Sequence, residues 1–413
     1  MEEKYRSRTV KTVRVAGLVA INVLCGSALA AQPGDVFVPY VEYSSNYYDN
    51  LLRLQDEATA LSRFGSTKLS DTYTTAVGGL RFDQTWGRQH VTADVSKNSN
   101  RYDHFSQYDY VGKDGRANWN WVLGNHLQGN LASMYSQSLV PFTDNIVVVQ
   151  NVRNIRTQRT NSADLAWLIH PSWRLRTAYA RYDLVYSSNE QGANDQRSDT
   201  AELGLSYLAR SGSNAGLVFR NIRGSYTGLQ TIGGESYNNN YVQKELKLSV
   251  NWLVTGKTRL QFLGGPVQRK REYFTSRDYS GVNARLTATT QSTGKLSFNA
   301  SVWRELGALD DLDANYALTD GVSFAPVLAI SSKFYLSGTA TYQRLDYSGA
   351  QVIEGLTPST RRDTYQRNSA DLTYRAGPSL SLTTTLSHEV RDSNLPNFSY
   401  RANGVSLRLR YEY

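Results

Sequence analysis

The chain of 413 residues carries 45 Lys and Arg against 36 Asp and Glu, and its mean hydropathy of −0.48 excludes a protein built from apolar transmembrane helices. Tyr is abundant at 28 residues, whereas Met occurs twice and Cys once, at position 25. Because Cys25 lies in a segment expected to be removed, we expect no disulfide, no redox thiol and no thiolate metal site in the mature chain.

The N-terminal segment has the three parts of a secretory signal. Basic residues between Lys4 and Arg14 precede the short apolar stretch Val15–Leu24, and Ala28-Leu29-Ala30 offers the small side chains that a signal peptidase accepts. We expect a signal peptide over residues 1–30, with Ala28 and Ala30 at the cleavage site, because the apolar stretch is too short for a transmembrane anchor. A lipoprotein anchor at Cys25 is disfavoured, since the large residue Leu24 precedes it.

From about Val36 to Tyr413, apolar and polar residues alternate with the period of two that strands require. Leu246, Leu248, Val250 and Trp252 alternate with Glu245, Lys247, Ser249 and Asn251, and residues 163–169, 201–207, 296–302 and 405–413 repeat the pattern. Such a secreted chain is either a soluble all-β protein or a membrane barrel. A soluble sandwich or solenoid is disfavoured, because so many regular hairpins would need a second sheet to cover them.

Short and long connections also alternate along the chain, as in outer-membrane barrels. Eight short turns, such as Thr85–Arg88 and Val254–Gly256, separate nine longer polar segments. Seventeen connections join eighteen strands, although sixteen strands remain possible, and an even number leaves both ends on the periplasmic side. We therefore predict an all-β fold, a transmembrane antiparallel up-and-down β-barrel over residues 31–413. The long segments are Tyr47–Leu69, Arg101–Gln107, Leu139–Thr157, Ser187–Gln196, Thr227–Asn238, Tyr273–Arg277, Glu305–Asp313, Ser348–Thr360 and Ser393–Phe398.

Aromatic residues near strand ends fit a girdle at the membrane interface: Trp121, Trp167, Tyr207, Trp252 and Tyr411. The last strand is similar to the terminal aromatic signal that the barrel-assembly machinery reads, carried here by Leu407, Leu409, Tyr411 and Tyr413. Outer-membrane lipid and that machinery are thus the expected partners of the barrel itself.

Two of the long connections have unusual composition. Apolar residues recur at roughly helical spacing in Leu51–Arg63, and Val147–Val152 could fold inward and narrow the pore. For both segments we favour ordinary loop packing over a helix or a constriction.

If the apolar set of each strand faces lipid, the other set lines a wet lumen. The acidic members of that set are Asp83, Asp94, Asp164, Glu202, Glu245, Asp371 and Glu389. The basic members are Arg81, Arg116, Arg174, Arg176, Arg220, Lys247, Arg259, Arg285, Arg375, Arg408 and Arg410. The basic excess indicates a conduit that guides an anionic solute such as an acidic polysaccharide. Pairing of Arg with Asp or Glu to stiffen the wall explains the same residues equally well.

No residue pattern indicates catalysis. The five histidines include His104, beside Asp103, and His388, beside Glu389, but neither has a recognisable partner set. Phosphate-binding loops, zinc spacings and calcium loops are absent from the sequence, and basic residues are dispersed among strands instead of clustered as in nucleic-acid binders. We expect no enzyme activity, no cofactor, no metal and no nucleic acid.

The start of the mature region carries one specific resemblance. Tyr40-Val41-Glu42-Tyr43, followed by Tyr48-Asp49-Asn50-Leu51-Leu52-Arg53-Leu54, resembles the opening strand and the Asp-Asn-Leu-Phe-Arg-Leu-type motif of EpsL-type proteins, with Leu52 in the place of Phe. That family is encoded with exopolysaccharide biosynthesis systems in Gram-negative bacteria. The resemblance implies an outer-membrane protein that acts in polysaccharide export together with an inner-membrane synthesis and polymerisation complex.

The leading functional hypothesis is therefore a passive outer-membrane conduit or accessory for exopolysaccharide export. One alternative is a general or anion-selective porin for small solutes. Another is a surface adhesin or assembly scaffold whose long loops carry the function.

Overall fold

The computed structural model describes residues 35–143, 153–188, 192, 194–232, 235–273, 275, 278–311, 314–348, 361–395 and 398–413. The expected signal peptide, including Ala28 and Ala30, and the segment Val147–Val152 lie outside these residues. No helix within the described ranges is both long and apolar enough to cross a membrane.

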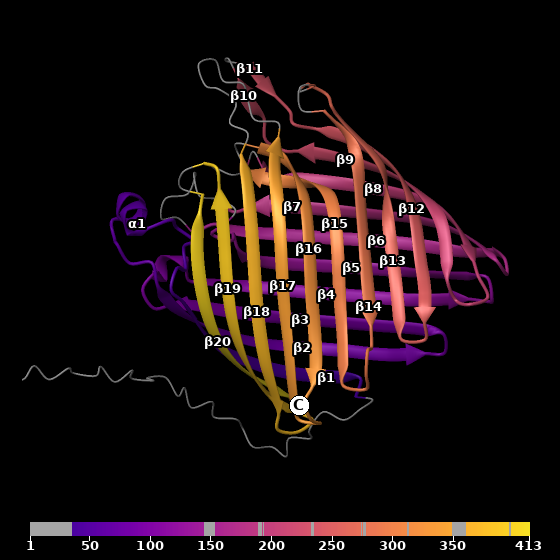
Figure 1. The fold of residues 1–413 in the computed structure, drawn as a ribbon, viewed down its shortest axis with the longest axis horizontal. Helices are drawn as coiled ribbons and strands as arrows, with labels where there is room; N and C mark the ends of the chain where they lie inside the picture. Colours follow the sequence, from indigo (N-terminus) through magenta and orange to yellow (C-terminus); the bar gives the residue numbers. More distant parts are fainter. Residues whose placement is uncertain are drawn as a thin grey trace, which may run out of the picture.

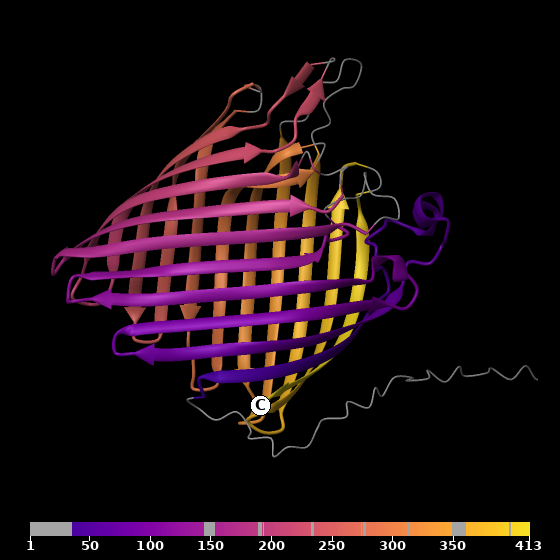
Figure 2. The same cartoon turned by 180° about the vertical axis from the view of Figure 1, so that it is seen from behind.

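Eighteen antiparallel strands close into one barrel, which confirms the predicted fold class and strand number (Figures 1 and 2). Each strand pairs with the next, and β1 closes the cylinder by pairing with β20 from Tyr40↔Glu412 to Tyr48↔Gly404. Every strand of the barrel thereby has a paired neighbour on both sides, as a sheet in lipid requires. The strands are β1 Phe37–Tyr48, β2 Asp71–Trp86, β3 Gln89–Tyr102, β4 Tyr110–Leu123, β5 Leu127–Leu139, β6 Ile155–His170, β7 Trp173–Tyr186, β8 Gln196–Leu208, β9 Asn214–Tyr226, β12 Tyr241–Thr255, β13 Thr258–Arg271, β14 Tyr279–Thr290, β15 Leu296–Asp311, β16 Ala314–Ala329, β17 Phe334–Ser348, β18 Arg362–Arg375, β19 Leu380–Ser393 and β20 Tyr400–Glu412.

The period of two separates an outer and an inner face. On β12 the even positions are exposed except for the half-buried Val250, and the odd positions from Tyr241 to Lys247 are buried. The even positions pair with outward residues of β9, as in Leu246↔Phe219. Large apolar side chains remain uncovered on the outer face, with Leu217 at 55% and Leu248 at 45% exposure. Because a soluble protein does not leave such an apolar band open to water, this surface belongs against lipid.

The two ends of the barrel differ as expected. The short turns lie at one end with both strand termini of the barrel, which is the periplasmic end of such proteins. The long connections lie at the other end. Figures 1 and 2 show helix α1 and the strands β10 and β11 projecting beyond it.

Three details of the long connections differ from expectation. Residues 305–311, predicted as loop, belong to β15, because the alternation continues and pairing with β16 persists past a bulge between Ala308 and Asp311. The fifth connection contains an unpredicted hairpin of β10 (Gln230–Ile232) and β11 (Glu235–Tyr237).

The third difference lies in the first connection, where we favoured plain loop packing and the structure has helix α1 over Glu57–Phe64. Asp56 caps its N-terminus by accepting a hydrogen bond from the Thr59 amide at 2.7 Å, and Gly65 ends it in the left-handed conformation at φ 68°. Leu51, Leu52 and Leu54 precede the helix and pack with Ala60, Tyr102, Phe105 and Tyr108 in a small apolar core. Burial raises the pKa of Tyr108 to about 12.

Candidate functional site: the inner wall and its two ends

All eleven basic residues expected in the lumen lie at inward positions of their strands. Their register partners on neighbouring strands are inward residues too, as in Asp94↔Arg116 and Glu245↔Arg220. Seven of the eleven form ion pairs with carboxylates of the same wall: Arg81, Arg176, Arg220, Lys247, Arg285, Arg408 and Arg410. The other four are Arg116, Arg174, Arg259 and Arg375, and none of them has an ion pair with any described residue. The wall therefore contains both ion-paired and unpaired basic residues, and pairing across the wall accounts for seven of the eleven.

One row of paired charges, here called the ion ladder, runs across β6, β7, β8, β9 and β12. Arg176 lies 3.5 Å from Asp164 and 3.1 Å from Glu202. Glu202 also binds Arg220 at 2.6 Å, and Arg220 reaches Glu245 at 3.1 Å. These charge-assisted bonds hold five neighbouring strands in register and leave few free charges along the row.

The ion ladder continues into a drier part of the wall. Glu245 is 3% exposed, accepts from Gln243 at 2.7 Å and pairs with Lys247 at 2.7 Å. Gln243 in turn accepts from Arg269 Nε at 2.7 Å. A buried charge with this many partners is a structural element of the wall, since leaving any of them alone would be costly.

Three of the four arginines without ion pairs lie at the periplasmic end, on strands that are not neighbours. Arg174 and Arg259 are the second residues of β7 and β13, and Arg375 is the last residue of β18. Arg375 stacks over the Tyr335 ring at 4.5 Å, and Arg174 Nε is buried without a hydrogen-bond partner. Arg116 lies midway along β4. Three uncompensated positive charges of the wall thus lie near the periplasmic opening, whereas Arg116 and the further inward residues Arg269 and Arg367, which also have no ion pair with a described residue, lie farther along it.

The periplasmic turns extend this charge around the rim. All eight turns are described, and together they contain five basic residues and no acidic one: Arg88, Arg210, Lys257, Lys295 and Lys333. None of the five forms an ion pair with a described residue, and Arg88 instead donates to the carbonyl oxygen of Gly124. We call these five residues together with Arg174, Arg259 and Arg375 the basic rim. A ring of like charge at an opening raises the local concentration of anions.

The opposite end is organised around buried ion pairs. Asp363 is 1% exposed and binds Arg361 at 2.7 Å and Arg391 at 3.5 Å. Arg361 stacks between the rings of Tyr347 and Phe398, at 4.2 and 3.8 Å. Arg391 Nη1 also donates to the carbonyl oxygen of Thr143, which ties β19 to the third connection. Sequence reasoning missed this cluster, although Asp363 shares its inward parity with the predicted Asp371.

The segment that carries the family resemblance lies at this same mouth, where its polar residues fasten the first connection to β19 and β20. Asp49 accepts from the Asn403 amide at 2.7 Å, and Asn50 Nδ2 donates to the carbonyl oxygen of Arg401 at 2.9 Å. Arg53, in a left-handed conformation at φ 57°, pairs with Glu389 at 2.9 Å. The motif thus has a defined structural role as a clamp at the extracellular mouth.

The remaining sequence candidates lie apart from one another. His388 is on the outer face and hydrogen-bonds Asn403, whereas its neighbour Glu389 points inward, so the two cannot act as a pair. His104 packs edge-on against Phe105. Leu407 and Leu409 are outward on β20, and the Tyr411 and Tyr413 rings meet at 4.8 Å.

No family model matches the chain, and no curated protein matches it. Solved structures similar to this chain include the outer membrane protein OpdK from Pseudomonas aeruginosa, with 9% identity over 91% of this chain and 99% of that chain and a TM-score of 0.48. The alcaligin outer membrane receptor FauA from Bordetella pertussis has 12% identity over 93% and 77%, with a TM-score of 0.44. OccAB3 from Acinetobacter baumannii has 11% identity over 91% and 99%, with a TM-score of 0.42.

Similarity at this level carries no argument about function, and the fold stands on its own strand pairing. A closed, even-stranded antiparallel barrel with an uncovered apolar band and unequal connections belongs to the bacterial outer membrane. The protein is an outer-membrane β-barrel.

Proposed function

We propose that the protein is a passive outer-membrane channel that favours anionic solutes, in the manner of an anion-selective porin. The observation that carries the proposal is the basic rim, whose eight residues have no ion-pair partner among the described residues, whereas most basic residues farther along the wall are neutralised. Free arginine and lysine side chains attract anions without holding them, since each contact is exposed and weak.

Conductance of the purified protein in a planar bilayer under a salt gradient tests this proposal. We expect an open current whose reversal potential shows preference for chloride over potassium. A cation-selective current, or a barrel that conducts no ions at all, would contradict it.

Export of an anionic polysaccharide is the second candidate, and the position of the basic rim favours it. The free charge lies at the periplasmic opening, where a polymer made inside the cell would enter, and the EpsL-type resemblance implies the same direction of transport. The inward ring of Tyr335, half-buried and stacked with Arg375 at 4.5 Å, adds an apolar surface near the periplasmic opening along which sugar rings can slide.

Two measurements separate the two functions. An acidic polysaccharide such as polygalacturonate added to one side of the bilayer should interrupt the current more often from the periplasmic side if the channel loads polymer there. A deletion strain should lose secreted polysaccharide if export is the function, whereas unchanged secretion together with reduced uptake of small anions supports the porin alone.

A further inference from the structure

The outer face of the barrel carries charged residues above its apolar band, at the extracellular end of the strands. Several of the basic residues there form ion pairs on that same face: Arg181 with Asp199, Arg197 with Asp183, Arg304 with Asp320, and both Arg344 and Arg362 with Asp346. Such pairing neutralises side chains that lie where lipid headgroups begin.

Across β9, β12 and β13 this pairing fails. Arg223, Lys244 and Lys270 are exposed outward residues, and none of them has an ion pair with a described residue. The register brings them together, because Val242 on β12 pairs with Arg223 on one side and with Lys270 on the other, while Lys244 is the next outward residue. Neighbouring strands lie about 4.8 Å apart, so Arg223 and Lys270 flank a gap of about 10 Å.

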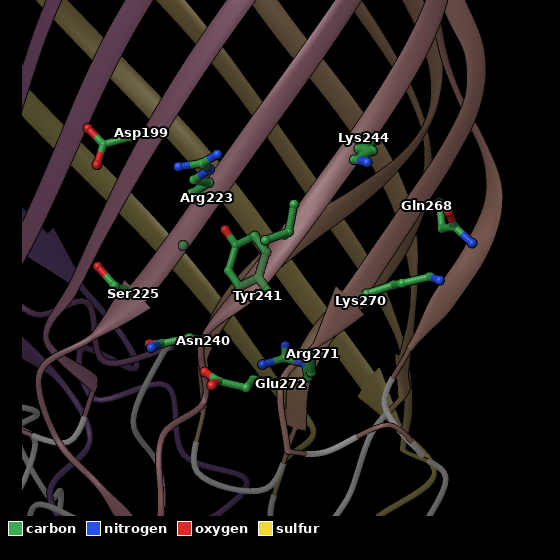
Figure 3. A pocket seen from close by; sticks show the side chains of 12 residues that line it. Asp199, Arg223, Ser225, Asn240, Tyr241, Lys244, Gln268, Lys270, Arg271 and Glu272 are labelled. Atoms are coloured by element: carbon green, nitrogen blue, oxygen red, sulfur yellow. The ribbon is translucent and has the colours of Figure 1, made fainter.

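These three residues line an open concavity of about 620 Å³ on the wall, to which Asp199, Gln268 and Tyr241 also contribute (Figure 3). Figure 3 shows the side chains of Arg223, Lys244 and Lys270 distributed over adjacent strands, with Gln268 beside the two lysines. Asp199, the nearest acid on β8, is already held by Arg181 at 2.7 Å and by the Tyr179 hydroxyl. It therefore does not neutralise the three cations. Glu272, the other acidic residue of the lining, accepts from Asn238 at 3.4 Å and has no ion pair with any of the three.

The position of the concavity along the barrel axis, relative to the apolar band, shows which part of the membrane it faces. On β12 the outward residues from Leu246 to Trp252 are apolar, and Lys244 follows directly above them. The eight steps from Trp252 to Lys244 rise about 27 Å along the strand, or about 21 Å along the barrel axis for strands tilted near 40°. Since the apolar band of such barrels is about 25 Å tall, Lys244 lies at its outer edge.

We propose that Arg223, Lys244 and Lys270 form a binding site for a phosphate group of the phosphorylated glycolipid in the outer leaflet. Arg offers a planar fork for phosphate and the two Lys offer point charges, so the three side chains present complementary donors to one anion. Gln268 adds an uncharged donor for a sugar hydroxyl. The acyl chains of the bound lipid lie against the apolar outward residues directly below, Leu246 and Phe219.

The site is tested with purified, folded mature protein in a zwitterionic detergent with chelator, and with bisphosphorylated lipid A as the probe in native mass spectrometry. We expect K244Q/K270Q to lower the apparent affinity for lipid A by at least about tenfold, because each basic residue near a membrane surface contributes about a fivefold factor toward anionic lipid. Migration of the unheated protein as a folded barrel on a gel confirms that each variant is intact.

The matched control is K97Q/K113Q. Lys97 and Lys113 also face outward, without an ion pair to a described residue, and they are register partners on β3 and β4. The variant therefore removes the same amount of charge from another part of the outer face. An equal loss of affinity for lipid A in both variants would overturn the site, because it would show only a general attraction of the lipid by outward basic residues. Unchanged binding in K244Q/K270Q would overturn it as well.

Two further probes identify the chemistry of the ligand. Dephosphorylated lipid A should bind wild type and K244Q/K270Q equally weakly, and inorganic phosphate alone should fail to compete at millimolar concentration if the acyl chains contribute. Competition by inorganic phosphate at that concentration would replace the glycolipid by a free anion and overturn the assignment.

Discussion

The periplasmic and extracellular ends of the barrel use similar side chains for different purposes. At the periplasmic end, the turns contain five basic and no acidic residues, and their charges are free. At the extracellular end, the described residues of the long connections include nine acidic and five basic residues. There, arginines such as Arg53 and Arg361 are committed to buried carboxylates.

The difference teaches that the partner of an arginine, more than its presence, decides its role. A guanidinium held by a buried carboxylate stabilises the wall and contributes little to the field in the lumen, because the pair is neutral. A guanidinium without such a partner contributes its full charge to the opening. The barrel thus has a mechanically fastened extracellular mouth and an electrostatically active periplasmic rim, and each can be altered without the other.

The largest effect is expected from breaking the extracellular fastening. D363A leaves Arg361 and Arg391 buried without their carboxylate, and removal of one partner from a buried ion pair costs about 3–5 kcal/mol of unfolding free energy. Urea unfolding in lipid vesicles, followed by tryptophan fluorescence and gel mobility, measures the loss. Anion preference of any folded fraction should stay unchanged.

The matched control for this variant is D346A. Asp346 also lies between two arginines, Arg344 and Arg362, but on the exposed outer face. Exposed pairs contribute only about 0.2–1 kcal/mol, so D346A should be far milder. Equal destabilisation by the two variants would show that burial of the Asp363 cluster does not matter.

At the basic rim the expected effect is on selectivity instead of stability. R174Q/R259Q/R375Q removes three uncompensated inward charges, and a ring of charge creates a potential of several kT, so the ratio of anion to cation permeability should fall by about tenfold. The reversal potential under a salt gradient measures this ratio. An unchanged ratio would place the selectivity of the pore elsewhere.

A change of opposite sign sharpens the same comparison. E202Q removes the carboxylate that Arg176 and Arg220 share, so one unit of positive charge becomes free in the ion ladder. We expect anion preference to rise by about twofold to threefold, since a single charge in a wet lumen changes the potential by about one kT. A fall in anion preference would show that the positive charge released by E202Q does not attract anions into the lumen.

The alternation of the sequence was sufficient to predict the barrel, the strand number and the inward position of every proposed lumen residue. It does so because lipid outside and water inside impose opposite demands on successive residues. What it could not predict was pairing, which depends on register between strands far apart in the chain. Arg81 pairs with Glu412, and Arg285 pairs with Glu305, a residue that the sequence assigned to a loop.

Loop structure was the other gap, for a related physical reason. Helix α1 depends on a short capped segment packing on Tyr102, Phe105 and Tyr108, so its stability comes from contacts with another connection. The clamp formed by Asp49, Asn50 and Arg53 likewise uses partners about 350 residues away. Neither leaves a periodic signal in the local sequence.

The smallest expected effect is a local one at the extracellular mouth, and it depends on pH. The hydrogen bond from the Thr59 amide lowers the pKa of Asp56 below its ordinary 3.8, so the folded helix prefers the ionised carboxylate. Its stabilisation of α1 is present above that ordinary value and is lost as the pH falls through the lowered one. Amide hydrogen exchange of residues 57–64 should therefore accelerate, relative to intrinsic rates, only at the acid end of a series from pH 2 to pH 6. D56N keeps an acceptor that does not titrate, so its protection should be independent of pH over this range, whereas a parallel acid response in D56N would assign the change to another group.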